Sequence, residues 1–129
     1  MLITSRGGLY EGGTQGQRYN LSRIVQKSVE ANKPMIAVSI NYRLSAFGFI
    51  WSKEVATNGT GNIGLRDQRL VLHGIQENIA GFGGDSTKVT VWGENAGGIA
   101  IGRQLTAYGG RDDKLFCATI MESGGLLER

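Results

Sequence analysis

The chain alternates between short apolar runs and longer segments in which apolar residues recur every three or four positions. The run from Met35 to Ile40 is almost continuously apolar, which is typical of a parallel strand covered on both faces. Between Leu21 and Val29 the spacing is that of one buried helix face, and Asn20 is a candidate N-cap. Applied to the whole chain, this reasoning predicts strands at 2–4, 35–40, 88–92 and 116–121 and helices at 20–32, 65–79 and 96–107.

Strands and helices follow one another in alternation, which implies right-handed βαβ crossovers and a parallel sheet. We therefore predict an α/β fold, with a mostly parallel sheet of about four strands and flanking helices. The stretch from Tyr42 to Gly64 lacks either period and is predicted to be irregular. No internal repeat or linker interrupts the 129 residues, which indicates a single domain.

Composition and charge disfavour several classes of function. The net charge of +3 comes from scattered Lys and Arg residues, which argues against a nucleic-acid-binding protein. No apolar run approaches the roughly 18 residues of a membrane span. No residue cluster has metal-ligand spacing, and no phosphate-binding or dinucleotide-binding loop occurs, so we expect neither a metal nor another cofactor. The first residues lack the pattern of a signal peptide, and the sequence leaves the compartment undefined.

Glycine is unusually frequent, at 21 of 129 residues, against an ordinary share of about 7%. The main candidate catalytic motif directly follows a predicted strand. It is Gly93-Glu94-Asn95-Ala96-Gly97. The spacing matches the nucleophile elbow G-x-S-x-G, a sharp strand-to-helix turn where two backbone segments approach closely. The position of the attacking Ser, however, is Asn95.

Further motifs keep their order along the chain: Asn41-Tyr42-Arg43, Gly61-Asn62-Ile63-Gly64-Leu65, Asp67-Gln68, Phe82-Gly83-Gly84-Asp85 and Glu122-Ser123-Gly124. On these motifs the chain resembles the type-B carboxylesterase and lipase family, cholinesterase-like α/β-hydrolases that include fungal lipases. The resemblance covers nearly every residue from Ile3 to Gly125. Domains of that family are several times longer, so we expect residues 1–129 to be a central fragment of one such domain.

The resemblance implies an acyl-transfer site for ester substrates. In the family the elbow Ser attacks the ester, and backbone N–H groups of an oxyanion hole stabilise the tetrahedral intermediate. By position, the nucleophile corresponds to Asn95 and the oxyanion-hole donors to Gly7, Gly8 and Ala96. The family's triad acid and histidine follow much later in its sequences, and we expect neither in this chain. The resemblance also implies a buried ion pair between Arg43 and Asp67.

Asn95 predicts loss of the hydrolytic reaction. A carboxamide nitrogen is delocalised and essentially non-basic, so a histidine cannot activate it as it activates a hydroxyl. Asn nevertheless tolerates positive φ better than most residues other than glycine, and it can therefore preserve the turn.

Other candidate groups fit a catalytic role less well. His73, the only histidine, shares a helix face with Arg66, Arg69 and Glu77 and is expected to be a solvated surface residue. Cys117 lies in an apolar run and is expected to be a buried small hydrophobic residue. Ser123 matches a structural element of the family rather than its nucleophile. Whether Glu94 contacts a substrate or only caps a helix stays open.

Three interpretations remain at this stage. The first, which we favour, is a catalytically incompetent fragment of a carboxylic ester hydrolase. The second is a non-catalytic binding or adhesion protein on the same scaffold. The third is a slice of an active serine esterase, with misplaced gene boundaries and an erroneous Asn at the elbow. Members of the family are often secreted. Uncovered sheet edges would also favour self-association of the isolated chain.

Overall fold

A computed structural model describes residues 2–5, 12–14 and 16–125. The strands within these residues form one parallel sheet in the order β2-β1-β3-β4. Their bounds are β1 Leu2–Ser5, β2 Ala37–Ile40, β3 Thr90–Glu94 and β4 Ala118–Glu122. The predicted α/β class and parallel sheet are confirmed, and each strand begins and ends within two residues of its predicted position.

The register of the sheet brings the ends of the strands level with one another. Ser5 pairs with Ile40 on one side and with Gly93 on the other. Gly93 in turn pairs with Met121 of β4. Because all the strands run the same way, the residues that come after them start from one edge of the sheet, the usual place for a site in an α/β fold.

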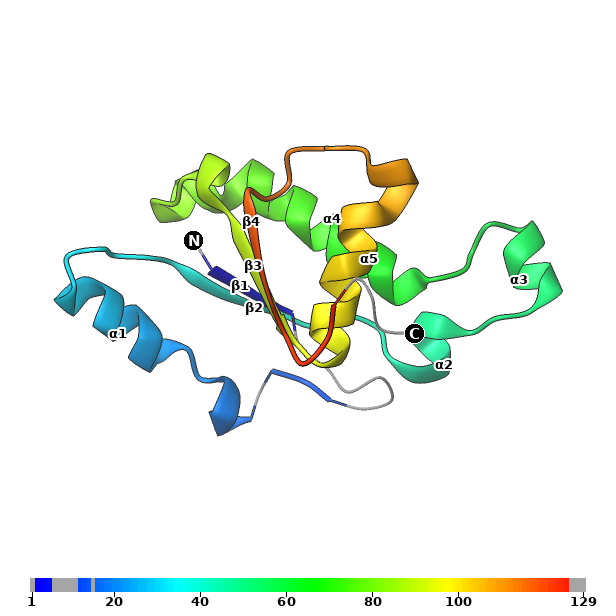
Figure 1. The fold of residues 1–129 in the computed structure, drawn as a ribbon, viewed down its shortest axis with the longest axis horizontal. Coiled ribbons are helices and arrows are strands. Elements are labelled where there is room, and N and C mark those ends of the chain that lie inside the picture. The colour runs from blue at the N-terminus through cyan, green and yellow to red at the C-terminus, as the bar shows by residue number, and fades with distance from the viewer. Residues whose placement is uncertain (1, 6–11, 15, 126–129) are drawn as a thin grey trace.

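The two long helices lie together over one face of the sheet, and a third helix lies on the other side (Figure 1). The pair over the first face is α4, Ile63–Asn78, and α5, Ala96–Gly110. The third is α1, Ser22–Glu30. Backbone angles within α5 leave the helical range at Ala107, Tyr108 and Gly109, so its regular part ends near Thr106.

The core lies between the sheet and its two long helices. Leu72 and Ile75 of α4 are buried, as is Ile79, which directly follows the helix. They pack with side chains of β2, β3, α5 and the segments before β3 and β4, namely Ile40, Val89, Val91, Ile101 and Leu115. This packing fixes α4 and α5 over β3, and with them the turn that leads from β3 into α5.

The predicted burial of the apolar face of α1 is wrong. The helix forms over the expected residues, and Asn20 Oδ1 accepts a hydrogen bond from the Ser22 N–H at 3.0 Å. None of its residues is buried, however, and Val29 is 58% exposed. Helical spacing predicts which residues share a face, but burial also requires an element that packs over that face.

The stretch predicted to be irregular contains two short helices, α2 Ser45–Phe49 and α3 Lys53–Thr57. Ser52 caps α3, since its hydroxyl oxygen accepts a hydrogen bond from the Val55 N–H at 3.2 Å. Helices of five residues span too few turns to show a hydrophobic period, so the pattern missed them. Single turns of 3₁₀ helix also occur at Gln17–Tyr19, Ile79–Phe82 and Ser86–Lys88.

Candidate functional site

The sequence Gly93-Glu94-Asn95-Ala96-Gly97 folds as a sharp strand-to-helix turn. β3 ends at Glu94, α5 begins at Ala96, and Asn95 is the one residue between them. Its backbone angles are φ 54° and ψ −119°, a region that side-chain-bearing residues rarely occupy. The geometry is that of the nucleophile elbow, with an exposed Asn at its apex.

Close backbone approach explains the first glycine of the turn. A Cβ atom on Gly93 would lie 2.5 Å from the Gly97 carbonyl oxygen and 2.9 Å from the Gly98 nitrogen. Gly98, in the first turn of α5, is also closely packed. A Cβ atom there would lie 2.8 Å from the Gly124 carbonyl oxygen. β3 and the segment after β4 therefore both pack against α5 at a distance that only glycine allows.

The side chain of Asn95 bonds to the backbone of its own turn. Its Oδ1 accepts a hydrogen bond from the Ala96 N–H at 2.7 Å. The Ala96 N–H, which the resemblance predicts to be an oxyanion-hole donor, therefore already has an acceptor. The sequence motif gave no indication of this bond, because it depends on the rotamer that Asn95 adopts.

The end of β4 and the residues that directly follow it form a supporting segment that contacts the turn. The Asn95 N–H donates to the Glu122 carbonyl oxygen at 2.8 Å. Gly124 packs so closely that a Cβ there would collide with the Asn95 carbonyl oxygen and lie 3.2 Å from the Ile99 nitrogen. Ser123 lies in this supporting segment, between the carbonyl and the glycine that contact the elbow. The contribution of the Glu122 carbonyl could not be predicted from the sequence, because every residue type carries the same backbone acceptor.

The other two predicted oxyanion-hole residues, Gly7 and Gly8, lie outside the described residues. Their strand is nevertheless in place, since β1 ends at Ser5, which pairs with Gly93. β1 therefore ends beside the strand that carries the elbow.

The Arg43 and Asp67 side chains form the predicted ion pair. Arg43 donates from its Nε at 2.8 Å and from its Nη2 at 2.6 Å, so the contact is bidentate. The hydrogen bonds from Arg43 hold the pKa of Asp67 below its ordinary value. The expectation that this pair is buried is wrong, because the Arg43 side chain is 56% exposed. The pair ties the segment after β2 to α4 at the surface of the protein.

His73 and Cys117 are both far from any catalytic arrangement. His73 is exposed on α4, as predicted. It lines a cavity with Arg103 and Ala107 of α5. Since a helix rises 1.5 Å per residue, Arg103 lies about 12 Å along α5 from Asn95. Cys117 is exposed, so its predicted burial is wrong: it directly precedes β4, which lies at the edge of the described sheet.

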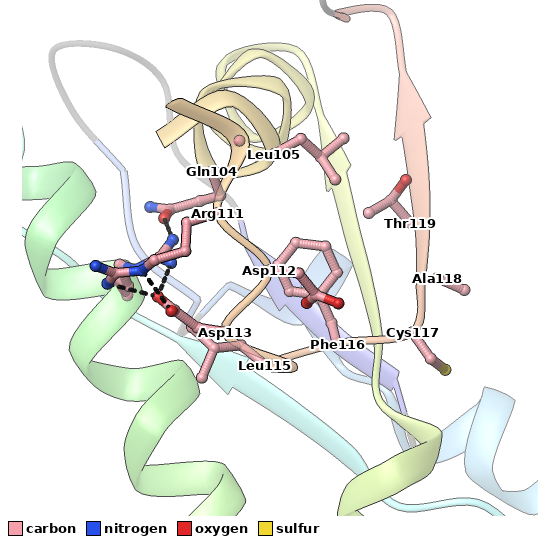
Figure 2. A pocket seen from close by; sticks show the side chains of 12 residues that line it. Gln104, Leu105, Arg111, Asp112, Asp113, Leu115, Phe116, Cys117, Ala118 and Thr119 are labelled. Carbon is pink, nitrogen blue, oxygen red and sulfur yellow. Dashed lines mark hydrogen bonds and ion pairs between the residues drawn. The ribbon is translucent and has the colours of Figure 1, made fainter. Parts of the chain in front are cut away.

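A second polar cluster lies at the opposite end of α5 from the elbow (Figure 2). Asp113 accepts hydrogen bonds from Arg69 and from Arg111, whose Nε lies 2.6 Å from Asp113 Oδ1. These bonds, led by those from Arg111, hold the pKa of Asp113 well below its ordinary value. Arg69 is buried and also donates to Gln104 at 3.3 Å. A cavity of about 330 Å³ lies beside this cluster and extends to Thr119 of β4.

Within the described residues, no three His, Cys, Asp or Glu side chains are grouped so that they could hold a metal ion. No helix in that part of the chain is both long and apolar enough to cross a membrane.

Comparison with known proteins gives consistent results. A family model described as the carboxylesterase family matches residues 1–129. Secreted lipase 1 of Botryotinia fuckeliana is 43% identical over 125 residues, which cover 94% of this chain and 21% of that protein. Lipase 1 of Geotrichum candidum is 41% identical over 131 residues, covering 98% of this chain and 23% of that lipase.

Solved structures are similar to this chain in fold as well as in sequence. The crystal structure of Aspergillus niger EstA matches with a TM-score of 0.79 and 34% identity, over 92% of this chain and 22% of EstA. A thermophylic PNB esterase matches with a TM-score of 0.83 and 35% identity, over 96% of this chain and 24% of the esterase. The chain therefore spans between a fifth and a quarter of the length of these relatives.

Proposed function

Because this chain belongs to the carboxylesterase family, we propose that it is a central section of one carboxylesterase domain whose elbow no longer supplies a nucleophile. The observation that carries the proposal is the position of Asn95 in the turn and the hydrogen bond of its side chain. The residue occupies the apex of a correctly folded elbow and offers an amide in place of a hydroxyl. Its Oδ1 also engages the Ala96 N–H, which a reacting carbonyl oxygen would need as a donor.

The surroundings of Asn95 support a loss of chemistry without a loss of fold. Asn keeps the positive φ that the turn requires, and Gly93, Gly98 and Gly124 keep the close packing around it. His73, the one histidine of the sequence, lies near the far end of α5 and cannot serve as a base at the elbow. The substrate class of the ancestral site is a carboxylic ester, in line with relatives named as lipases and esterases.

The test measures hydrolysis of p-nitrophenyl acetate and butyrate by this chain and by its Asn95→Ser and Asn95→Ala variants. We expect all three to stay at the rate of buffer, since Ser at position 95 would still have no histidine beside it. Turnover by the original chain that disappears in Asn95→Ala would overturn the proposal.

A separate experiment tests whether Asn95 is genuine. Peptide sequencing across Gly93-Glu94-Asn95-Ala96-Gly97, with the intact mass of the native polypeptide, distinguishes an inactive homologue from an ordinary serine esterase. Asn at position 95 supports the proposal. Ser at that position, in a polypeptide much heavier than 13.9 kDa, would favour an active serine esterase.

The second candidate function is a non-catalytic binding protein on the same scaffold. It is favoured by the retention of a folded elbow after the loss of its nucleophile, which points to a scaffold that is still maintained. Under this hypothesis the chain binds partners or ligands through its surface, and the acyl esters above are neither hydrolysed nor required.

A further inference from the structure

A cavity of about 530 Å³ lies between α4 and the end of α5, away from the elbow. Its most notable feature is its charge. Four arginines and the only histidine line it: Arg66, Arg69, His73, Arg103 and Arg111. No carboxylate side chain of a described residue belongs to the lining.

The cluster is produced by the fold rather than by a run of basic residues. Arg66, Arg69 and His73 are spaced three and four positions apart, which places them on one face of α4. Arg103 projects from α5, and the chain turns back after Tyr108, whose φ is 53°, to bring in Arg111. Basic residues that are scattered in sequence are thus gathered at one site.

Two of the arginines are held in place by their neighbours. Asp113 binds both Arg69 and Arg111, so one carboxylate serves two guanidinium groups (Figure 2). Both guanidinium groups also lie about 5 Å from the centre of the Tyr108 ring, within cation–π range. This arrangement fixes the direction of Arg111 at the cavity wall and leaves an excess positive charge.

The remaining basic side chains have no acidic partner among the described residues. Arg66 donates to the carbonyl oxygen of Gly59, a neutral group. Within the same part of the chain, Arg103 and His73 take part in no ion pair. Each guanidinium carries five N–H donors, so most donors of Arg66 and Arg103 are available to a ligand.

We propose that this cavity binds a small polyanion through its phosphate or carboxylate oxygens. Guanidinium groups match these oxyanions with paired, charge-assisted hydrogen bonds. The volume lies in the range of small-ligand sites, about 300 to 1,000 Å³. A bound anion would offset the mutual repulsion of Arg66, Arg103 and Arg111. The site is independent of the elbow and of any ester chemistry there.

The only histidine of the chain provides the readout. Because His73 lines the cavity, its imidazole C2 proton gives one NMR signal that reports on binding without assignment of the whole spectrum. Inorganic phosphate, pyrophosphate and citrate are titrated separately at fixed pH and constant ionic strength. We expect a saturable shift of the His73 signal, and the comparison of the three probes distinguishes phosphate from carboxylate recognition.

Substitutions then decide whether binding is local. Arg103→Gln and Arg66→Gln should each weaken binding about tenfold, the loss of one charge-assisted contact. The matched control is Arg23→Gln, which removes the same charge from an exposed position on α1. Circular dichroism confirms that each variant is folded. A shift that does not saturate, or equal weakening by Arg23→Gln, would overturn the proposal.

Discussion

Asn95 meets two requirements of this turn, one with its backbone and one with its side chain. As a residue at φ 54°, it satisfies a backbone requirement that glycine meets most easily. As the N-cap of α5, its Oδ1 satisfies the Ala96 N–H, one of the unpaired donors at the start of every helix. A serine at this position would have a shorter side chain than Asn, and it would tolerate the positive φ less well. Asn95 therefore fits the turn in both its backbone angles and its side-chain bond.

The double role of Asn95 predicts different outcomes for two small replacements. Asn95→Ala loses the cap and keeps a Cβ at positive φ, so the free energy of unfolding should fall by about 2 kcal/mol. Asn95→Gly loses the same bond but relieves the backbone, so its change should stay within about 0.5 kcal/mol. Urea unfolding of the three chains measures the difference. Equal destabilisation by Ala and Gly would show that backbone strain has no part in it.

Asp85 makes the stability of the folded chain depend on pH in the acid range. Its carboxylate accepts hydrogen bonds from the Thr87 hydroxyl at 2.6 Å and from the Thr87 N–H at 2.9 Å, and it pairs with Lys88 at 3.1 Å. These contacts, led by the Thr87 side chain, lower the pKa of Asp85 from 3.8 to about 2. Because the folded pKa is depressed, the stabilisation is complete above pH 3.8 and disappears as the pH falls toward 2.

Replacement of Asp85 should remove that part of the acid sensitivity. Asp85→Asn is expected to be less stable than the original chain at pH 7, and the gap should close between about pH 4 and about pH 2. Thermal unfolding across this range measures both chains. Asp112→Asn is a control, because the pKa of Asp85 does not depend on it. A gap that is constant with pH would contradict the assignment.

At the level of single residues, sequence predicted the features that depend on residue type and missed those that depend on rotamers and neighbours. The crowding at Gly93 and the positive φ of Asn95 were predictable, because the sterics of a sharp turn depend on residue type alone. The bond from Ala96 to Asn95 depends on a side-chain rotamer. The exposure of Cys117 depends on which strand lies at the edge of the sheet, and an apolar run carries no such information.

At the level of elements, the contact between β3 and α5 is the one that positions the site. Gly93→Ala would place a Cβ 2.5 Å from the Gly97 carbonyl oxygen, with the backbone of α5 as the obstacle. We expect the variant to lose about 3 kcal/mol of stability or more, since backbone cannot move aside as a flexible side chain can. Gly81→Ala is the matched control in the same urea-unfolding measurement. Its Cβ would meet no atom within 4 Å, and it should change stability by less than about 0.5 kcal/mol.

The elements themselves were predictable to different degrees. The strands were predicted from short apolar runs, and α4 was predicted because its apolar residues repeat over enough positions to define a face. The regular part of α5 was predicted from its place after the elbow motif. α2 and α3 are too short to do so, and they depend instead on local contacts such as the Ser52 cap and the packing of α2 against α4. The half-exposed α1 shows the opposite case, a clear period without a partner to bury it.

At the level of the whole molecule, the described sheet has β2 and β4 at its edges. β4 carries Ile120, which is 44% exposed, and its outer backbone groups have no strand beside them among the described residues. We predict that the purified chain self-associates through this edge, as uncovered strands invite pairing. Sedimentation should show species that grow with concentration.

A charged residue on β4 should reduce that association. Ile120→Lys is expected to shift the chain toward the monomer, because pairing would then bury a lysine. Gln26→Lys adds the same charge at an exposed position of α1 and is expected to leave association unchanged. A monomer at all concentrations for the original chain would contradict the prediction.

The strand order also has a consequence for how the protein is made. β1 is synthesised before the other described strands and lies inside the sheet, yet one of its two neighbours, β3, comes about 90 residues later in the sequence. At the usual rate of about 5 to 20 residues per second, a ribosome needs about 4 to 18 s to supply that neighbour. For those seconds the nascent chain exposes an unpaired side of β1, and chaperones that bind extended segments would find their target there before the elbow exists.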